Sequence, residues 1–209
     1  MNQEIYKAIL DRILFFQYVP GQILNENALA KEFGLSRTPL REVLSRLEWE
    51  QLVKIIPRTG TIVSEIEFQK MMHVFQIRLE IEDLAGRLAA EMVTEEHLDR
   101  INNIKQECIK LLEQRSQKNL IRMDFKFRDV LYDAANNPVL KDISRYLYHL
   151  TIRLSYTLFE RGDWKEGVEA SLHEYEQVYT ALSRKDAQQA GEMRRKWLRK
   201  HIERIKDKF

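Results

Sequence analysis

The chain has 209 residues, of which 44% are apolar and 32% charged; it can build a substantial core, and a disordered chain is excluded. Seven glycines and four prolines are too few for a turn-rich β protein and favour long helices. The single cysteine, Cys108, excludes an internal disulfide and a thiolate metal cluster. No apolar run of membrane length and no signal peptide is recognisable, so we expect a cytoplasmic protein with no membrane partner.

The formal net charge of +2 conceals a basic C-terminal segment. Residues 184–209 hold ten Lys or Arg and four Asp or Glu. Such a run is typical of a solvated helix face and, less often, of a nucleic-acid-binding surface. We favour the solvated face.

Residues 1–66 begin with three short predicted helices. Apolar residues spaced by four, four and three predict a helix over 1–16; they are Ile5, Ile9, Ile13 and Phe16. A Pro-Gly pair at 20–21 interrupts the chain. A second helix starts after Asn25, which can cap it, and ends at Gly34. The third starts at Ser36, and its apolar face consists of Leu40, Val43, Leu44 and Leu47.

A β pattern follows Leu52. Residues 53–56 and 61–63 are short β-rich runs separated by Pro57-Arg58-Thr59-Gly60, so they predict a hairpin. Three short helices followed by a hairpin constitute a winged helix-turn-helix. We therefore predict a DNA-binding domain of this type over residues 1–66.

From residue 67 onward, only helical patterns occur. They predict six helices, over residues 67–92, 95–115, 119–135, 139–160, 165–184 and 187–207. The whole chain is therefore predicted to be mostly α, with an all-α bundle of six or seven helices over 67–209.

The exposed face of the third predicted helix carries residues suited to reading DNA. Arg37 and Arg41 are four apart, so they share a face near the N-terminal end, the part that a helix-turn-helix inserts into the major groove. An arginine fork matches guanine O6 and N7, and Ser36 and Thr38 can bind phosphate. The predicted hairpin tip adds Arg58, Thr59 and Gly60. Two surface arginines alone would suggest an ordinary helix, but the cap, turn and hairpin together favour DNA binding.

These residues give the chain a resemblance to a known family. The stretch from Leu35 to Glu48, together with Gln51-Leu-Val and Pro57-Arg-Thr-Gly, resembles the winged helix of the GntR family of bacterial transcription regulators. Residues 77–82, 88–90 and 134–140, with Asp124, resemble the helical effector domain, called FCD, of the family's FadR branch. The resemblance spans essentially the whole chain.

The resemblance implies a homodimer that binds a palindromic DNA operator and changes its affinity when a small molecule occupies the helical domain. It also implies that the DNA contacts are Arg37, Thr38, Arg41, Arg58, Thr59 and Gly60. Asn27 departs from the pattern, because some members have an arginine there.

The resemblance also bears on metal binding, because many FCD domains hold a divalent cation with one aspartate and three histidines. Asp124 stands at the aspartate position, whereas Arg128, Tyr175 and Trp197 stand at the histidine positions. Zinc and nickel prefer imidazole or carboxylate ligands, and a guanidinium repels a cation. We therefore predict no metal and no other cofactor.

Arginines on apolar helix stripes indicate which kind of ligand the helical domain binds in place of a metal ion. Arg78 and Arg153 each interrupt such a stripe, and Arg128 lies one turn from Asp124, ready for an ion pair. Buried arginines need anionic partners. Three arginines facing a single aspartate would leave a net positive charge without a partner. We predict a small anionic effector, a carboxylate or phosphate, bound by these side chains. Tyr175 and Trp197 would form the pocket's walls.

Other interpretations stay open. The arginines can form structural pairs with Asp124, Glu80 or Glu82, or extend to water, and the regulator then has a metal-dependent effector site or no effector. We expect no enzyme, because no nucleophile–base pair, phosphate-binding loop or metal-ligand spacing is recognisable. An architectural DNA-binding protein would not need the second domain, which occupies about two thirds of the chain.

Overall fold

The computed structural model describes residues 2–208, and the chain divides into two compact units, Met1–Met71 and Met72–Phe209. The boundary expected from the sequence, between residues 66 and 67, falls a few residues earlier. Helix α4 (Phe68–Met92) begins in the first unit and continues into the second.

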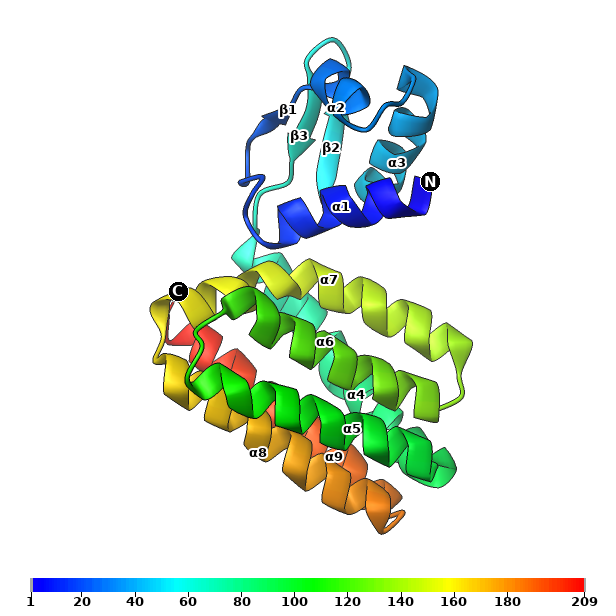
Figure 1. Cartoon of the computed structure of the whole chain (residues 1–209), viewed down its shortest axis with the longest axis vertical. Coiled ribbons are helices and arrows are strands. Elements are labelled where there is room, and N and C mark those ends of the chain that lie inside the picture. Colours follow the sequence, from blue (N-terminus) through cyan, green and yellow to red (C-terminus); the bar gives the residue numbers. More distant parts are fainter. Residues whose placement is uncertain (1, 209) are drawn as a thin grey trace. The chain divides into compact units, whose positions relative to one another are not determined.

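The N-terminal unit is a winged helix-turn-helix, as the sequence predicts (Figure 1). Its elements are α1 (Asn2–Leu14), β1 (Ile23–Leu24), α2 (Glu26–Glu32), α3 (Arg37–Trp49), β2 (Val53–Ile56) and β3 (Gly60–Val63). The predicted hairpin is β2–β3, an antiparallel pair in which Ile55 lies opposite Thr61. The two-residue strand β1 adds to the other edge of β3; it was not predicted, because two residues are too short to show a β pattern.

Local chemistry sets the helix ends in this unit. The side chain of Asn25 accepts a hydrogen bond from the Ala28 amide at 3.0 Å and so caps α2. Gly34 takes the left-handed conformation that ends it, with φ of 63°. Ser36 occupies the N-cap position of α3, although its side chain makes no capping hydrogen bond. α1 packs against α3 through a fully buried apolar core that includes Ile9, Ile13, Leu44 and Leu47.

The C-terminal unit consists of helices joined by short turns over its described residues. After α4 come α5 (Glu95–Ile109), the 3₁₀ turn η1 (Lys110–Leu112), α6 (Gln117–Ala134), α7 (Pro138–Arg161), α8 (Trp164–Ser183) and α9 (Ala187–Lys206). The six predicted helices are confirmed, although the one predicted over 95–115 ends at Ile109 and tightens into η1. Side-chain caps start five of these helices, at Thr94, Ser116, Asn137, Asp163 and Asp186.

Two glycines bring α4 and α9 unusually close together. A Cβ added to Gly86 would lie 2.7 Å from the Ala190 carbonyl oxygen, and one added to Gly191 would lie 2.8 Å from the Asp83 carbonyl oxygen. Only glycine therefore fits at either point of the crossing. The helix pairs α5–α6, α5–α8, α6–α7 and α8–α9 complete the packing (Figure 1). No helix among the described residues is long and apolar enough to span a membrane.

Candidate functional site

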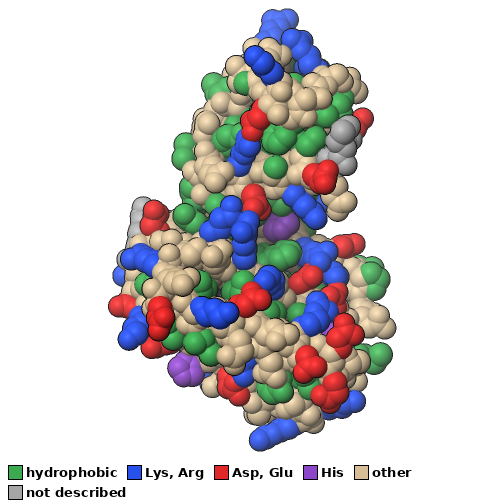
Figure 2. All heavy atoms as spheres, in the orientation of Figure 1, with side chains coloured by type: hydrophobic (Ala, Val, Ile, Leu, Met, Phe, Trp, Pro, Cys, Tyr) green, Lys and Arg blue, Asp and Glu red, His purple; other side chains and the backbone are tan. Residues whose placement is uncertain are grey.

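The predicted DNA-reading residues lie together at one end of the N-terminal unit. Helix α3 buries Leu40, Val43, Leu44 and Leu47, so its opposite face is free for contacts. Ser36, Arg37, Thr38 and Arg41 are exposed there. The start of α3 and the β2–β3 turn lie at the same end of the unit (Figure 1), where Lys and Arg side chains gather (Figure 2). The structure thus brings the two predicted groups together.

The turn between β2 and β3, which forms the tip of the wing, has an unusual backbone conformation. Arg58 is exposed and takes a left-handed conformation with φ of 66°, which is uncommon for a residue with a side chain. Gly60 has φ of 116°, a conformation that favours glycine. The turn between β2 and β3 therefore presents Arg58 and Thr59 outward from the end of the sheet.

Arg41 has a partner that the sequence did not indicate. Its Nε lies 3.6 Å from Glu26 Oε2, and its side chain remains 72% exposed. The other carboxylate oxygen of Glu26 accepts a hydrogen bond from the Thr61 hydroxyl at 2.9 Å. Glu26, on α2, therefore links α3 to β3. No local pattern reveals this link, because Thr61 is 35 positions away in the chain.

The second unit contains a buried charge cluster: Arg78 and Glu82 of α4, Asp124 and Arg128 of α6, Glu174 of α8, and Arg194 of α9. Glu82 is at its centre and is 1% exposed. Its Oε1 accepts hydrogen bonds from Arg128 at 2.7 Å, from Arg78 at 3.0 Å and from the Tyr132 hydroxyl at 3.0 Å. Its Oε2 accepts one from Arg194 at 2.5 Å. A single carboxylate thus ties three arginines from three helices.

The remaining carboxylates complete the cluster. Asp124 Oδ2 accepts hydrogen bonds from Arg128 Nε at 2.9 Å and from the Tyr148 hydroxyl at 2.8 Å, and Glu174 pairs with Arg194. Burial alone would raise the pKa of Glu82, but the arginines hold that pKa well below its ordinary value. Burial dominates at Glu174 and raises its pKa.

The predicted effector residues separate into two groups. Arg78, Asp124 and Arg128 lie in the charge cluster, and Tyr175 is fully buried next to it, with its ring centroid 4.3 Å from that of Phe127. The other two are Trp197 and Arg153.

Trp197 lies near the surface, where its indole N–H donates to Gln177 at 3.1 Å. Arg153 is buried on α7, two residues after Thr151, which accepts a hydrogen bond from Arg78.

The structure corrects the charge count behind the predicted excess of positive charge. Asp124 is not the only carboxylate, since Glu82 and Glu174 also face the arginines, and Arg194 is an additional buried cation. The open alternative that an arginine pairs with Glu82 is confirmed. Arg194 interrupts the buried stripe of α9, so the stripe argument applied to Arg78 could have found it. Glu174 carries no comparable pattern.

The residues that the family resemblance places at a metal position do not fit a metal ion. The Arg128 guanidinium donates directly to Asp124 and so places a fixed positive charge where a cation would bind. Tyr175 and Trp197 offer no good ligand at neutral pH. In the part of the chain that the structure describes, no group of three or more His, Cys, Asp or Glu side chains could hold a metal. His201 instead bonds Ser155 at 2.8 Å, and burial lowers its pKa to about 3.

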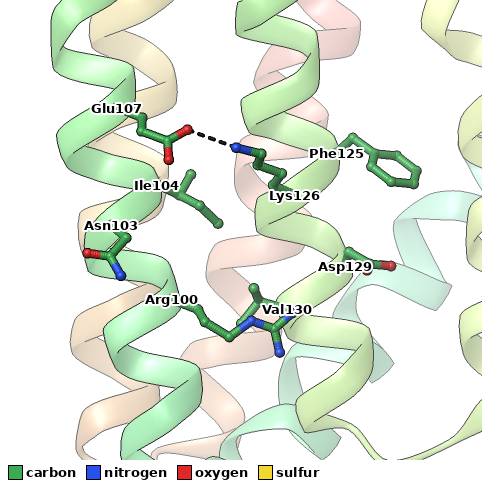
Figure 3. A pocket seen from close by; sticks show the side chains of 8 residues that line it. All are labelled: Arg100, Asn103, Ile104, Glu107, Phe125, Lys126, Asp129 and Val130. Carbon is green, nitrogen blue, oxygen red and sulfur yellow. Dashed lines mark hydrogen bonds and ion pairs between the residues drawn. The ribbon is translucent and has the colours of Figure 1, made fainter. Parts of the chain in front are cut away.

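A separate groove lies between α5 and α6 (Figure 3). Its volume is about 260 Å³, and Lys126 reaches across it to Glu107 at 2.8 Å. Arg100, another lining residue, is paired with Asp133 at 3.0 Å. None of the predicted effector residues lines this groove.

A winged helix-turn-helix joined to a separate helical unit is the architecture of a DNA-binding transcription regulator. Residues 1–63 match the model for bacterial regulatory proteins of the gntR family, and residues 73–204 match the FCD domain. The chain belongs to the GntR family of DNA-binding transcription regulators and carries an FCD effector-binding domain.

Known relatives extend along nearly the whole chain. The HTH-type transcriptional repressor RspR of Escherichia coli K12 is 26% identical over 99% of this chain and 88% of its own length. The Bacillus subtilis regulator YdhC is 28% identical over 90% of this chain and 83% of its own length. The solved structure of E. coli McbR superposes with a TM-score of 0.89 at 22% identity, covering 99% of this chain and 97% of McbR, which supports the fold.

Proposed function

We propose that the protein binds a palindromic operator as a homodimer through Arg37, Thr38, Arg41 and the wing, with Ser36 and Thr38 at phosphates. The observation that carries this proposal is the shared end of the N-terminal unit at which these exposed residues gather. Two recognition helices need two half-sites, so a symmetric dimer implies a symmetric operator. The similarity to RspR, a repressor, supports repression as its mode of action.

Selection of bound sequences from random DNA tests the operator. An inverted repeat is expected, and Arg41→Ala should weaken binding to it by about 1–3 kcal/mol and relax the preference at one base pair of each half-site. Arg199→Ala, which removes an exposed arginine of α9, serves as the control. An equal loss on random and selected DNA would mean that Arg41 contacts phosphate instead of a base.

We propose further that the effector is a small anion, most simply a carboxylate, bound beside the charge cluster. Three buried donors there have no acceptor within the described residues: Arg78 Nε, Arg194 Nε and the Tyr175 hydroxyl. Buried donors are normally satisfied, and an anion supplies several acceptors at once. Of the residues predicted for this site, Arg78, Asp124, Arg128 and Tyr175 support the proposal by position. Arg153 is buried on α7, and Trp197 would have to reorient.

Melting temperatures measured with monocarboxylates, dicarboxylates, sugar acids and inorganic phosphate, against chloride at matched ionic strength, test this site. A ligand that binds only the folded state raises the melting temperature. Tyr175→Phe removes a donor that has no partner, so it should leave the ligand-free melting temperature unchanged or higher but reduce the ligand's shift. Zinc and nickel should produce no shift. If the ligand raises the melting temperature of Tyr175→Phe as much as that of the wild type, the ligand binds elsewhere, for instance in the α5–α6 groove.

The second candidate is a regulator whose helical unit takes no small-molecule effector. The specific observation in its favour is that Glu82, Asp124 and Glu174 already match Arg78, Arg128 and Arg194 in number. In that case the cluster is a structural replacement for the metal. No carboxylate or phosphate would then change either the melting temperature or the affinity for the selected operator.

A further inference from the structure

Glu26 is an acidic residue in contact with Arg41, one of the residues that we propose bind DNA. It lies in the first turn of α2, where the partial positive charge of a helix N-terminus favours a carboxylate. Each of its two carboxylate oxygens has a partner, the Arg41 guanidinium on α3 and the Thr61 hydroxyl on β3. DNA phosphates repel a carboxylate beside a DNA-binding arginine. A negative charge at this position therefore lowers the affinity for DNA in general, which raises the question of what it contributes.

The sheet holds the Glu26 carboxylate in place. Thr61 is fully buried, and its hydroxyl donates to Glu26 Oε1 at 2.9 Å. Strand β3 is the central strand of the sheet, and Thr61 lies opposite Leu24 of β1 on one side and Ile55 of β2 on the other. The hydroxyl is thus attached to backbone that is paired on both sides. The bond to Oε1 fixes the position of Oε2, the oxygen that faces Arg41.

The contact with Glu26 engages one part of the Arg41 guanidinium. Oε2 lies 3.6 Å from Arg41 Nε, an ion pair rather than a hydrogen bond, and the arginine side chain is 72% exposed. A guanidinium is a planar fork whose five N–H donors have a fixed geometry. A carboxylate at Nε therefore leaves the terminal edge, Nη1 and Nη2, for DNA. Two donors on one edge match O6 and N7 of a guanine.

We propose that Glu26 is a positioning residue for sequence recognition, which holds Arg41 at Nε so that the Nη1–Nη2 edge meets a guanine. The inference rests on the DNA contact proposed above for Arg41. Without Glu26, the long arginine side chain can turn to a neighbouring phosphate, a contact that carries no sequence information. Glu26 therefore lowers the affinity for DNA of any sequence and increases the discrimination between base pairs.

Three DNA duplexes test this role in the full chain: the selected operator, the operator altered at the base pair whose preference Arg41→Ala relaxes, and random DNA. Glu26→Gln keeps the side-chain shape and an oxygen for the Thr61 hydroxyl but lacks the charge that attracts Arg41. The ratio of affinities for the selected and altered operators should fall about 2- to 5-fold, as expected for one partly exposed ion pair. The affinity for random DNA should not fall. Weaker binding to all three duplexes with an unchanged ratio would mean that Glu26 only stabilises the domain, and would overturn the proposal.

Glu32→Gln is the matched control. Glu32 is also on α2 and pairs with an arginine, Arg12 of α1. The variant therefore loses the same charge and one ion pair, but it should keep the wild-type ratio of affinities. An equal fall of the ratio in Glu32→Gln would attribute the effect to net charge and would contradict a specific role for Glu26.

A double variant separates an action through Arg41 from a direct contact. In the Arg41→Ala background, Glu26→Gln should change the ratio no further. A further fall there would mean that Glu26 itself accepts a hydrogen bond from a base, as a carboxylate does from cytosine N4, and would overturn the positioning role. If Arg41→Ala relaxes no base pair, the proposed contact of Arg41 with a base is itself wrong. If Arg41→Ala relaxes one and Glu26→Gln leaves the ratio unchanged, only the role of Glu26 is wrong.

Discussion

Replacing Glu82 by glutamine tests the charge cluster most directly. The substitution preserves the shape of the side chain and removes its charge. It leaves Arg78, Arg128 and Arg194 facing only Asp124 and Glu174, and the amide cannot accept from all the groups that now donate to Glu82. Because Glu82 and Arg194 are 1% and 0% exposed, water cannot replace the lost partner.

The expected loss follows from this burial. Removing one partner of a buried ion pair typically costs about 3–5 kcal/mol, since the remaining charge stays desolvated and unpaired. Three arginines share Glu82, so Glu82→Gln should lie in the upper half of that range. The free energy of unfolding of a domain is only about 5–15 kcal/mol. The midpoint of urea unfolding of the C-terminal unit should therefore be much lower in Glu82→Gln than in the wild type.

Urea unfolding followed by circular dichroism measures the effect, with Glu80→Gln as the control. Glu80 is on the same helix and also pairs with an arginine, but its side chain is 72% exposed, so its loss should cost less than about 1 kcal/mol. A loss below about 1 kcal/mol for Glu82→Gln as well would refute the idea that Glu82 holds the cluster together. Selective stabilisation of Glu82→Gln by added phosphate or carboxylate would show that an anion can take its place.

Two further predictions concern the same unit. Gly191→Ala should destabilise it by about 1–3 kcal/mol despite alanine's better helix propensity, because the new Cβ would lie 2.8 Å from the Asp83 carbonyl oxygen; an unchanged urea midpoint would contradict the close α4–α9 crossing. His201 should make the wild type less stable as the pH falls from about 6.5 towards 3. Burial lowers its folded pKa to about 3, so the unfolded chain binds the proton first. His201→Gln should reduce the slope of unfolding free energy against pH in that window, and an identical slope in both proteins would count against a partly buried, neutral His201.

The secondary structure could be predicted from the sequence, and so could the end of the N-terminal unit that we propose contacts DNA. Helices can be predicted from local features. Here these are the apolar spacing of α1 and α3, the cap at Asn25 and the left-handed conformation of Gly34. The winged helix could be predicted because its residues are close in the chain and follow such rules. The strand β1 was missed because its two residues become a strand only by pairing with β3.

Tertiary structure alone decided how the charges are matched. Arg78, Arg128 and Arg194 meet at Glu82 from helices separated by up to 112 positions, and the sequence does not state which carboxylates reach which arginines. The link from Glu26 to Arg41 and Thr61 is another such case. The physical reason is that helix formation depends on neighbours within one or two turns. The partner of a buried charge depends on how whole helices pack, and here two glycines set the distance at which α4 and α9 cross.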